Sequence, residues 1–93
     1  MHYFYIIYSK KVDRYYIGET NCLSERLRRH NSTISKKAFT KIAQDWEYAL
    51  TYKTDSRRDA LYLESLVKRM KSRKFIQKII SNQHILHDSL LKK

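Results

Sequence analysis

The first apolar stretch of the chain is a run of β-branched and aromatic residues, Tyr3 to Tyr8, that predicts a strand buried on both faces. A short polar link follows it, and Arg14 to Gly18 then predict a second strand. Two strands joined by so short a link must be antiparallel, because a parallel pair needs a crossover of about a dozen or more residues. The chain is therefore expected to begin with a β-hairpin.

The register of this hairpin decides which side chains meet across it. A turn centred on Val12 places Tyr8 opposite Tyr16 and Ile6 opposite Gly18. Directly opposed residues have Cβ atoms about 5 Å apart, so this register predicts two neighbouring phenols on one face of the sheet. A tyrosine on a strand most often serves packing. Two phenols beside cations would instead point to chemistry, because a nearby positive charge lowers the pKa of a phenol.

A short helix is predicted over residues 23–31. Leu23 and Leu27 stand one turn apart and would form its buried side. Thr20 or Asn21 would cap its N-terminus, since both side chains can accept the unpaired N–H groups of a first turn. Residues 32–44 are polar and basic and predict a loop with at most one helical turn.

The second half of the chain predicts one strand and two helices. Trp46 to Tyr52 alternate between apolar and polar residues, as a half-buried strand does. A long helix follows from Asp55 or Ser56 to about Lys71, and Ser72 caps a further helix through Ile80. This order predicts an α+β domain over residues 1–82, with residues 83–93 as a C-terminal tail for which no element is predicted.

Charge indicates the class of partner. The 93 residues include 20 Lys and Arg against 9 Asp and Glu, which gives a formal net charge of +11. A polyanion would relieve the self-repulsion of such a chain, and nucleic acid is the commonest one, with counterion release supplying much of the affinity. A solvated basic surface, an anionic membrane and ribosomal RNA are the alternatives that charge leaves open.

Size and composition narrow the class of protein. The length suits one domain, and a hydrophobic content of 42% excludes a disordered polyelectrolyte. One cysteine, Cys22, forms no internal disulfide and fits a reducing compartment. The chain holds no apolar run of the roughly 20 residues that cross a bilayer, and its start does not resemble a signal peptide. We expect a cytoplasmic protein without a membrane segment.

Four residues besides the tyrosines could carry chemistry. Gly18 is the only glycine and stands where a phosphate could approach the backbone, although a simple kink at the strand end explains it equally well. Arg26 and His30 share one helical face and suit a phosphate, or form a basic solvated face. Glu64 borders the buried stripe of the long helix, where a carboxylate could hold a divalent cation, or form an ordinary ion pair with Lys68.

An ordered set of motifs resembles the signature of the GIY-YIG nuclease family. The matching segments are Ile6-Ile7-Tyr8, Tyr16-Ile17-Gly18, the block from Thr20 to Asn31, and the block from Arg57 to Lys68 that contains Glu64. The resemblance runs from about Tyr3 to Ile80. It is closest to small single-domain members related to the GIY-YIG nuclease domain of the excision-repair machinery. It implies a three-stranded antiparallel sheet flanked by helices and a one-metal phosphodiesterase that acts on DNA.

Carried over position by position, the resemblance implies a role for each site residue. Tyr8 and Tyr16 are the tyrosines of the first and second motifs, and either would act as general base or orient the attacking water. Arg26 would hold the scissile phosphate and stabilise its developing charge. Glu64 would ligate a single Mg²⁺ or Mn²⁺. His30 would support the water or the phosphate.

The expected DNA-binding residues are the glycine and five basic side chains: Gly18, Arg26, Arg29, Lys36, Lys37 and Lys68. Two positions depart from the pattern of the family. Ile6 stands where the first motif has glycine, as in many short members. Glu19 stands where some relatives carry lysine, and its negative charge weakens the attraction for phosphate.

Three hypotheses follow in order of preference. The first is a metal-dependent endonuclease for branched or damaged DNA, which a separate protein partner would target, since catalytic domains this small often depend on one. The second is a nucleic-acid-binding module of the same fold that does not cleave or needs a partner to do so, and Glu19 motivates it. The third is a basic protein bound to RNA or to the ribosome.

Overall fold

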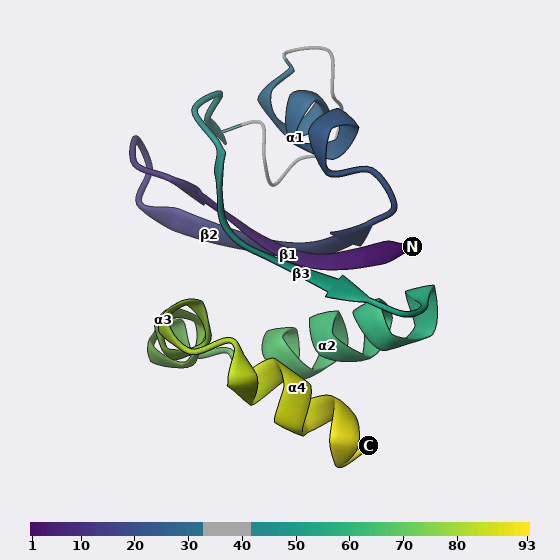
Figure 1. Ribbon diagram of the computed structural model, residues 1–93. Helices are drawn as coiled ribbons and strands as arrows, with labels where there is room; N and C mark the ends of the chain where they lie inside the picture. The colour runs from purple at the N-terminus through teal and green to yellow at the C-terminus, as the bar shows by residue number, and fades with distance from the viewer. Residues whose placement is uncertain (33–41) are drawn as a thin grey trace.

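The computed structural model describes residues 1–32 and 42–93 (Figure 1). Three strands form its sheet: β1 (His2–Ser9), β2 (Arg14–Thr20) and β3 (Glu47–Thr54). Their order is β2-β1-β3, so β1 is central, and it runs antiparallel to both neighbours. The predicted α+β class and three-stranded antiparallel sheet are confirmed.

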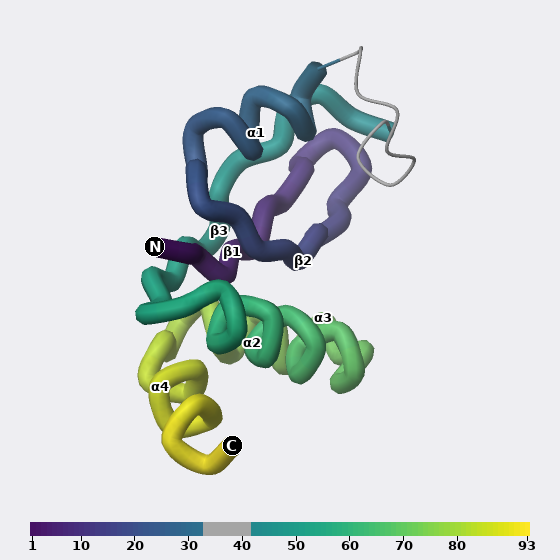
Figure 2. Tube along the Cα trace, turned by 90° about the vertical axis from the view of Figure 1, so that its right-hand side faces the viewer, coloured from purple at the N-terminus to yellow at the C-terminus, as the bar shows by residue number. Residues whose placement is uncertain are grey.

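Helices cover both faces of this sheet. α1 (Leu23–Asn31) lies on one face, and α2 (Arg57–Met70), α3 (Arg73–Ser81) and α4 (His84–Leu91) lie on the other (Figures 1 and 2). Within the part of the chain that the structure describes, no helix has both the length and the apolarity that crossing a bilayer requires.

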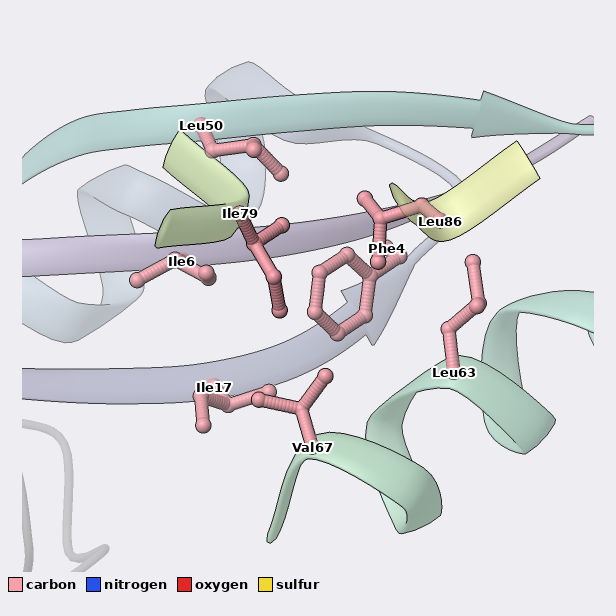
Figure 3. Packing of buried hydrophobic residues seen from close by; sticks show 8 residues of the cluster. All are labelled: Phe4, Ile6, Ile17, Leu50, Leu63, Val67, Ile79 and Leu86. Atoms are coloured by element: carbon pink, nitrogen blue, oxygen red, sulfur yellow. The ribbon is translucent and has the colours of Figure 1, made fainter. Parts of the chain in front are cut away.

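The central strand is buried on both sides, as its apolar run predicts. Phe4 and Ile6 point toward α2, α3 and α4 and join the larger core cluster, which Figure 3 shows in part. Tyr5 and Ile7 point to the opposite face and pack with Trp46 in a smaller cluster beneath α1. Each face of β1 therefore supports its own layer of helices.

Serine hydroxyls cap the N-termini of α2 and α3, but the side chain of its N-cap residue does not cap that of α1. Ser56 and Ser72 cap α2 and α3 as predicted, since each oxygen accepts an N–H bond from the residue three positions on. α1 covers the predicted residues, but its N-cap is Cys22, which makes no side-chain cap bond. Thr20, predicted with Asn21 as a candidate cap, instead exchanges hydrogen bonds with the backbone of Cys22, at 3.1 and 3.2 Å.

The C-terminal residues form an element that the sequence pattern did not predict. α4 occupies most of residues 83–93, and Leu86 is 1% exposed within the larger core cluster. Ile85 and Leu90 pack against the same cluster. The C-terminal residues thus belong to the helical layer that α2 and α3 form on one face of the sheet.

Candidate functional site

The hairpin register differs from the predicted one by a single residue, which changes the tyrosines that meet. Tyr5 lies opposite Gly18, and Tyr8 lies opposite Tyr15. A shift of one residue moves each side chain of a strand to the other face. Tyr5 and Tyr16 therefore share the face that α1 covers, and the predicted pairing of Tyr8 with Tyr16 is wrong.

The turn of the hairpin explains this register. Four residues, 10–13, separate the two strands, so the turn centres between Lys11 and Val12 rather than on Val12. Asp13 has a left-handed backbone, with φ of 53°, and the Ser9 hydroxyl accepts a bond of 3.3 Å from the N–H of Val12. Aspartate tolerates the left-handed region better than most residues, which suits it to this corner.

Tyr8 takes part in a surface network away from the face of Tyr16. Its hydroxyl donates to the carboxylate of Asp13, and Arg73 donates to the same carboxylate at 2.5 Å. The bond to Asp13 raises the pKa of Tyr8, contrary to the lowering expected of a phenol beside a cation. The Tyr8 ring packs against Tyr15 with centroids 4.7 Å apart.

Tyr5, and not Tyr8 as the sequence analysis predicted, lies on the same face of the sheet as Tyr16. Its side chain is fully buried, and its hydroxyl lies 2.8 Å from Nε2 of His30 and 3.1 Å from Nε of Arg26. Because the Nε–H of Arg26 only donates, the Tyr5 oxygen accepts from it. The tautomer of His30 decides which partner donates in the bond between the Tyr5 hydroxyl and Nε2.

Burial sets the protonation states of this pair. Desolvation raises the pKa of Tyr5 to about 12, and the hydrogen bond from Arg26 only partly opposes it. Desolvation also lowers the pKa of His30 to about 4, helped by the positive charges of Arg26 and Arg29. At neutral pH, a phenol and a neutral imidazole thus face each other beside a guanidinium.

This pair makes the stability of the fold sensitive to pH. The His30 pKa is about 4 in the folded chain and about 6.5 in the unfolded one, so between these values only the unfolded chain binds the proton. The free energy of unfolding should fall by about 2 kcal/mol between about pH 7.5 and about pH 4.5 through this group. His30→Gln keeps an acceptor but does not titrate. Urea titrations should show the smaller fall in the variant, and parallel pH profiles would contradict the prediction.

Gly18 provides the space for the Tyr5 ring. A Cβ built on Gly18 would lie 2.5 Å from the Tyr5 hydroxyl oxygen and 2.7 Å from its Cζ. Gly18 is buried and does not have a positive φ, so backbone freedom is not the reason for this residue. The glycine lets the ring cross β2 and carry its hydroxyl to Arg26 and His30.

Glu64 approaches the same edge of the sheet from α2. Its Oε2 lies 2.6 Å from Nζ of Lys68, and that ammonium lies 5.8 Å from the ring centroid of Tyr16. The ion pair that the sequence allowed as an alternative is therefore present. The negative charge of Glu64 also contributes to the raised pKa of Tyr5, which places the carboxylate within electrostatic reach of the buried phenol. Tyr16 completes the group, with its ring centroid 5.1 Å from that of His30.

The model of one protein family matches this chain. The GIY-YIG catalytic domain covers residues 1–78, which is most of the 93 residues. The chain belongs to the GIY-YIG family. This is a family of nucleases that are generally metal-dependent and act on DNA. Neither a curated protein nor a solved structure matches the chain, and the relation to the excision-repair nuclease domain stays a prediction.

A basic cavity opens beside this group of side chains around Tyr5, where β2 leads into α1. It has a volume of about 460 Å³, and Arg26, Arg29 and Arg57 line it. Glu19 lies at its wall, with a side chain that is 16% exposed and 3.6 Å from Nε of Arg57. His2 lies 3.9 Å from the same carboxylate. The carboxylate of Glu19 therefore lies next to the Arg57 guanidinium and the His2 imidazole.

The remaining predicted DNA-binding residues have different positions. Arg29 is exposed on α1, and Lys68 is exposed on α2 beside Glu64. Lys36 and Lys37 lie outside the described residues.

Among the residues that the structure describes, no cluster of three or more His, Cys, Asp or Glu could hold a metal ion. Glu64 is therefore not part of such a cluster, and a cation held there would have its carboxylate as the protein ligand. This donor set suits Mg²⁺, which commonly keeps several waters and binds through one or two carboxylates together with substrate phosphates.

Proposed function

We propose that this protein is a metal-dependent endonuclease that hydrolyses DNA phosphodiester bonds by water attack. The observation that carries the proposal is the group of side chains above Gly18: the Tyr5 hydroxyl bonded to both His30 and Arg26, beside Tyr16. Glu64, on α2, lies near enough for its negative charge to help raise the pKa of Tyr5. The group combines an anion binder, a hydroxyl that orients water and receives its proton, and a carboxylate, which are the parts that hydrolysis of a phosphodiester needs.

Arg26 is the residue that binds the scissile phosphate. Its Nε donates to Tyr5 at 3.1 Å, which fixes the plane of the guanidinium. The terminal nitrogens of a guanidinium form a planar fork that matches two phosphate oxygens. Arg26 also lines the basic cavity, through which the phosphate reaches it. Charge that develops on the phosphoryl oxygens in the transition state is thereby stabilised.

Tyr16 orients the attacking water, and Tyr5, which takes the role that the sequence analysis gave to Tyr8, positions the neighbouring side chains. The Tyr5 hydroxyl is fully buried and bonds both His30 and Arg26, so it holds them in place beside the phosphate. The water gives its proton to the hydroxyl of the half-buried Tyr16, which passes its own proton to solvent. The water oxygen then bonds to phosphorus, the bond from phosphorus to the 3′ oxygen breaks, and the 3′ oxygen takes a proton from solvent.

Glu64 is the residue that would hold the metal. A single bound Mg²⁺ or Mn²⁺ would polarise the phosphate and stabilise the leaving 3′ oxygen. The carboxylate is one-fifth exposed, so waters and phosphate oxygens can complete the coordination. Lys68 would then exchange its bond with Glu64 for the phosphate backbone, because both groups attract the same ammonium.

The direct test is incubation of the purified protein with labelled single-stranded, duplex and branched DNA. We expect cleavage with Mg²⁺ or Mn²⁺ and none in EDTA. Competition between DNA and RNA at fixed salt addresses the hypothesis of an RNA-bound protein. If the protein binds DNA but cleaves none of the substrates tested, the proposal that it is an endonuclease is contradicted.

One observation favours the second candidate, a DNA-binding module without cleavage. The ammonium of Lys68 lies 2.6 Å from the Glu64 carboxylate and competes with a metal for it. If the pair persists with DNA bound, no metal enters. Titration with Mn²⁺, whose paramagnetism broadens the NMR signals of nearby nuclei, separates the two candidates, because only the enzyme should show broadening of the Glu64 side-chain signals.

The two tyrosines give a matched pair of variants. We expect Tyr5→Phe to lower the cleavage rate by about 10²-fold, because it removes the hydroxyl that joins Arg26 to His30. Tyr8→Phe should leave the rate within about twofold, since its hydroxyl bonds only Asp13 in the described network. Single-turnover assays measure both rates. A larger loss in Tyr8→Phe than in Tyr5→Phe would restore the original assignment.

A further inference from the structure

A second cleft lies between the edge strand β2 and the junction of α2 with α3. Its volume is about 760 Å³, within the range of roughly 300–1,000 Å³ that small-ligand sites occupy. Ile17, Val67 and Ile76 provide an apolar floor, and Tyr15 and Tyr16 add aromatic surface. Apolar and aromatic surface of this kind suits the face of a planar base.

The rim of the cleft is basic. Its cationic side chains are Arg14, Lys68, Lys71 and Arg73. The one acidic residue that lines it is Asp13, which already accepts bonds from Arg73 and from Tyr8. The opening therefore attracts anions, and phosphate groups flanking a base would meet this charge.

Two residues connect this cleft to the proposed catalytic site. Tyr16 lines the cleft and packs against His30, with ring centroids 5.1 Å apart. Lys68 lines the cleft and contacts Glu64 at 2.6 Å. A DNA strand bound near Glu64 therefore passes only Tyr16 and Lys68 before it reaches the cleft.

We propose that this cleft binds an unpaired nucleotide of the DNA substrate, with its base on the apolar floor and its phosphates on the basic rim. The proposal rests on the proposed function, which supplies DNA as the substrate. A base inside a duplex is paired and stacked, so it does not offer its face to a protein without extrusion. Single-stranded nucleotides do offer it, and binding sites for them combine a positive groove with aromatic surface. The cleft would thus favour substrates with an unpaired strand beside the scissile bond.

Binding in EDTA tests this preference independently of cleavage. Arg14→Gln with Lys71→Asn removes two rim charges, and asparagine suits the left-handed backbone of Lys71, whose φ is 48°. Lys74→Gln with Lys78→Gln removes two exposed charges of α3 outside the cleft and serves as the control. We expect the rim variant to lose about tenfold in affinity for a duplex with a flap and about twofold for a blunt duplex. The control should lose equally on both.

Photo-cross-linking locates the base. A flap that carries 5-iodouracil beside the duplex junction should cross-link to the peptide containing Tyr15 and Tyr16, and the rim variant should reduce the yield about tenfold. Equal loss of affinity for flap and blunt duplex, or cross-links only elsewhere, would overturn the proposal. Because both measurements use EDTA, an absence of nuclease activity would contradict the proposed function alone. Active enzyme without flap preference would contradict only the role of the cleft.

Discussion

Glu64→Gln is expected to lower the single-turnover cleavage rate by about 10⁴-fold while leaving DNA affinity equal to or above that of the wild type. The amide keeps the size of the side chain but loses the charge that would hold the cation. Several kcal/mol of transition-state stabilisation are then lost, at 1.36 kcal/mol for each factor of ten. Affinity does not fall, because the change removes a negative charge from a protein of formal charge +11 that binds a polyanion.

The fold should tolerate this substitution. The pair between Glu64 and Lys68 is partly exposed, with side chains 20% and 49% accessible, and pairs of this kind contribute at most about 1 kcal/mol. Thermal melts should therefore nearly coincide. Glu47→Gln is the matched control, since Glu47 is exposed on β3, at the opposite edge of the sheet from β2. Equal cleavage by wild type and Glu64→Gln would reveal a contaminating nuclease and contradict the role of Glu64.

Residues whose positions depend on local periodicity were predicted well. The helical spacing of Arg26 and His30 places them on one face of α1, and both reach the Tyr5 hydroxyl. Glu64 was predicted at the border of the buried stripe, and its side chain is one-fifth exposed there. A helix repeats within a few residues, so its own sequence determines which side chains share a face.

The predicted pairing of Tyr8 with Tyr16 was wrong because strand register is not a local property. Alternation identifies the face of a strand only when one face is polar, and Tyr3 to Tyr8 are apolar on both. The turn has no Asn-Gly or Asp-Gly pair to fix its length either. A signal for the correct register did exist. The only glycine must face the residue that needs its space, and in the observed register that residue is Tyr5.

α4 was missed for a different reason. Of its eight residues, His84 to Leu91, only Leu86 is fully buried, so the helix has little apolar periodicity of its own. Its position depends on the larger core cluster, to which distant segments such as Phe4 and Leu63 contribute. The sequence of a short helix does not reveal a surface that other elements create.

Gly18→Ala should lower the free energy of unfolding by about 3 kcal/mol and reduce cleavage in the fraction that remains folded. The new methyl group would lie 2.5 Å from the Tyr5 oxygen and 2.7 Å from its Cζ. The ring cannot move aside easily, because it is fully buried and bonded to Arg26 and His30. Overpacking in such a site costs about 1–3 kcal/mol, and displacement of the hydroxyl adds the loss of two hydrogen bonds.

Double-mutant cycles with Tyr5 identify the ring as the cause. In a Tyr5→Leu background the contacts with the ring no longer exist, and Gly18→Ala should then cost less than about 1 kcal/mol or even stabilise the strand, where glycine is itself unfavourable. Tyr5→Phe removes only the closest contact, so an intermediate cost is expected. Urea titrations give these free energies even where cleavage is lost. A constant cost of Gly18→Ala in all three backgrounds would show that the glycine serves the backbone of β2 rather than the Tyr5 ring.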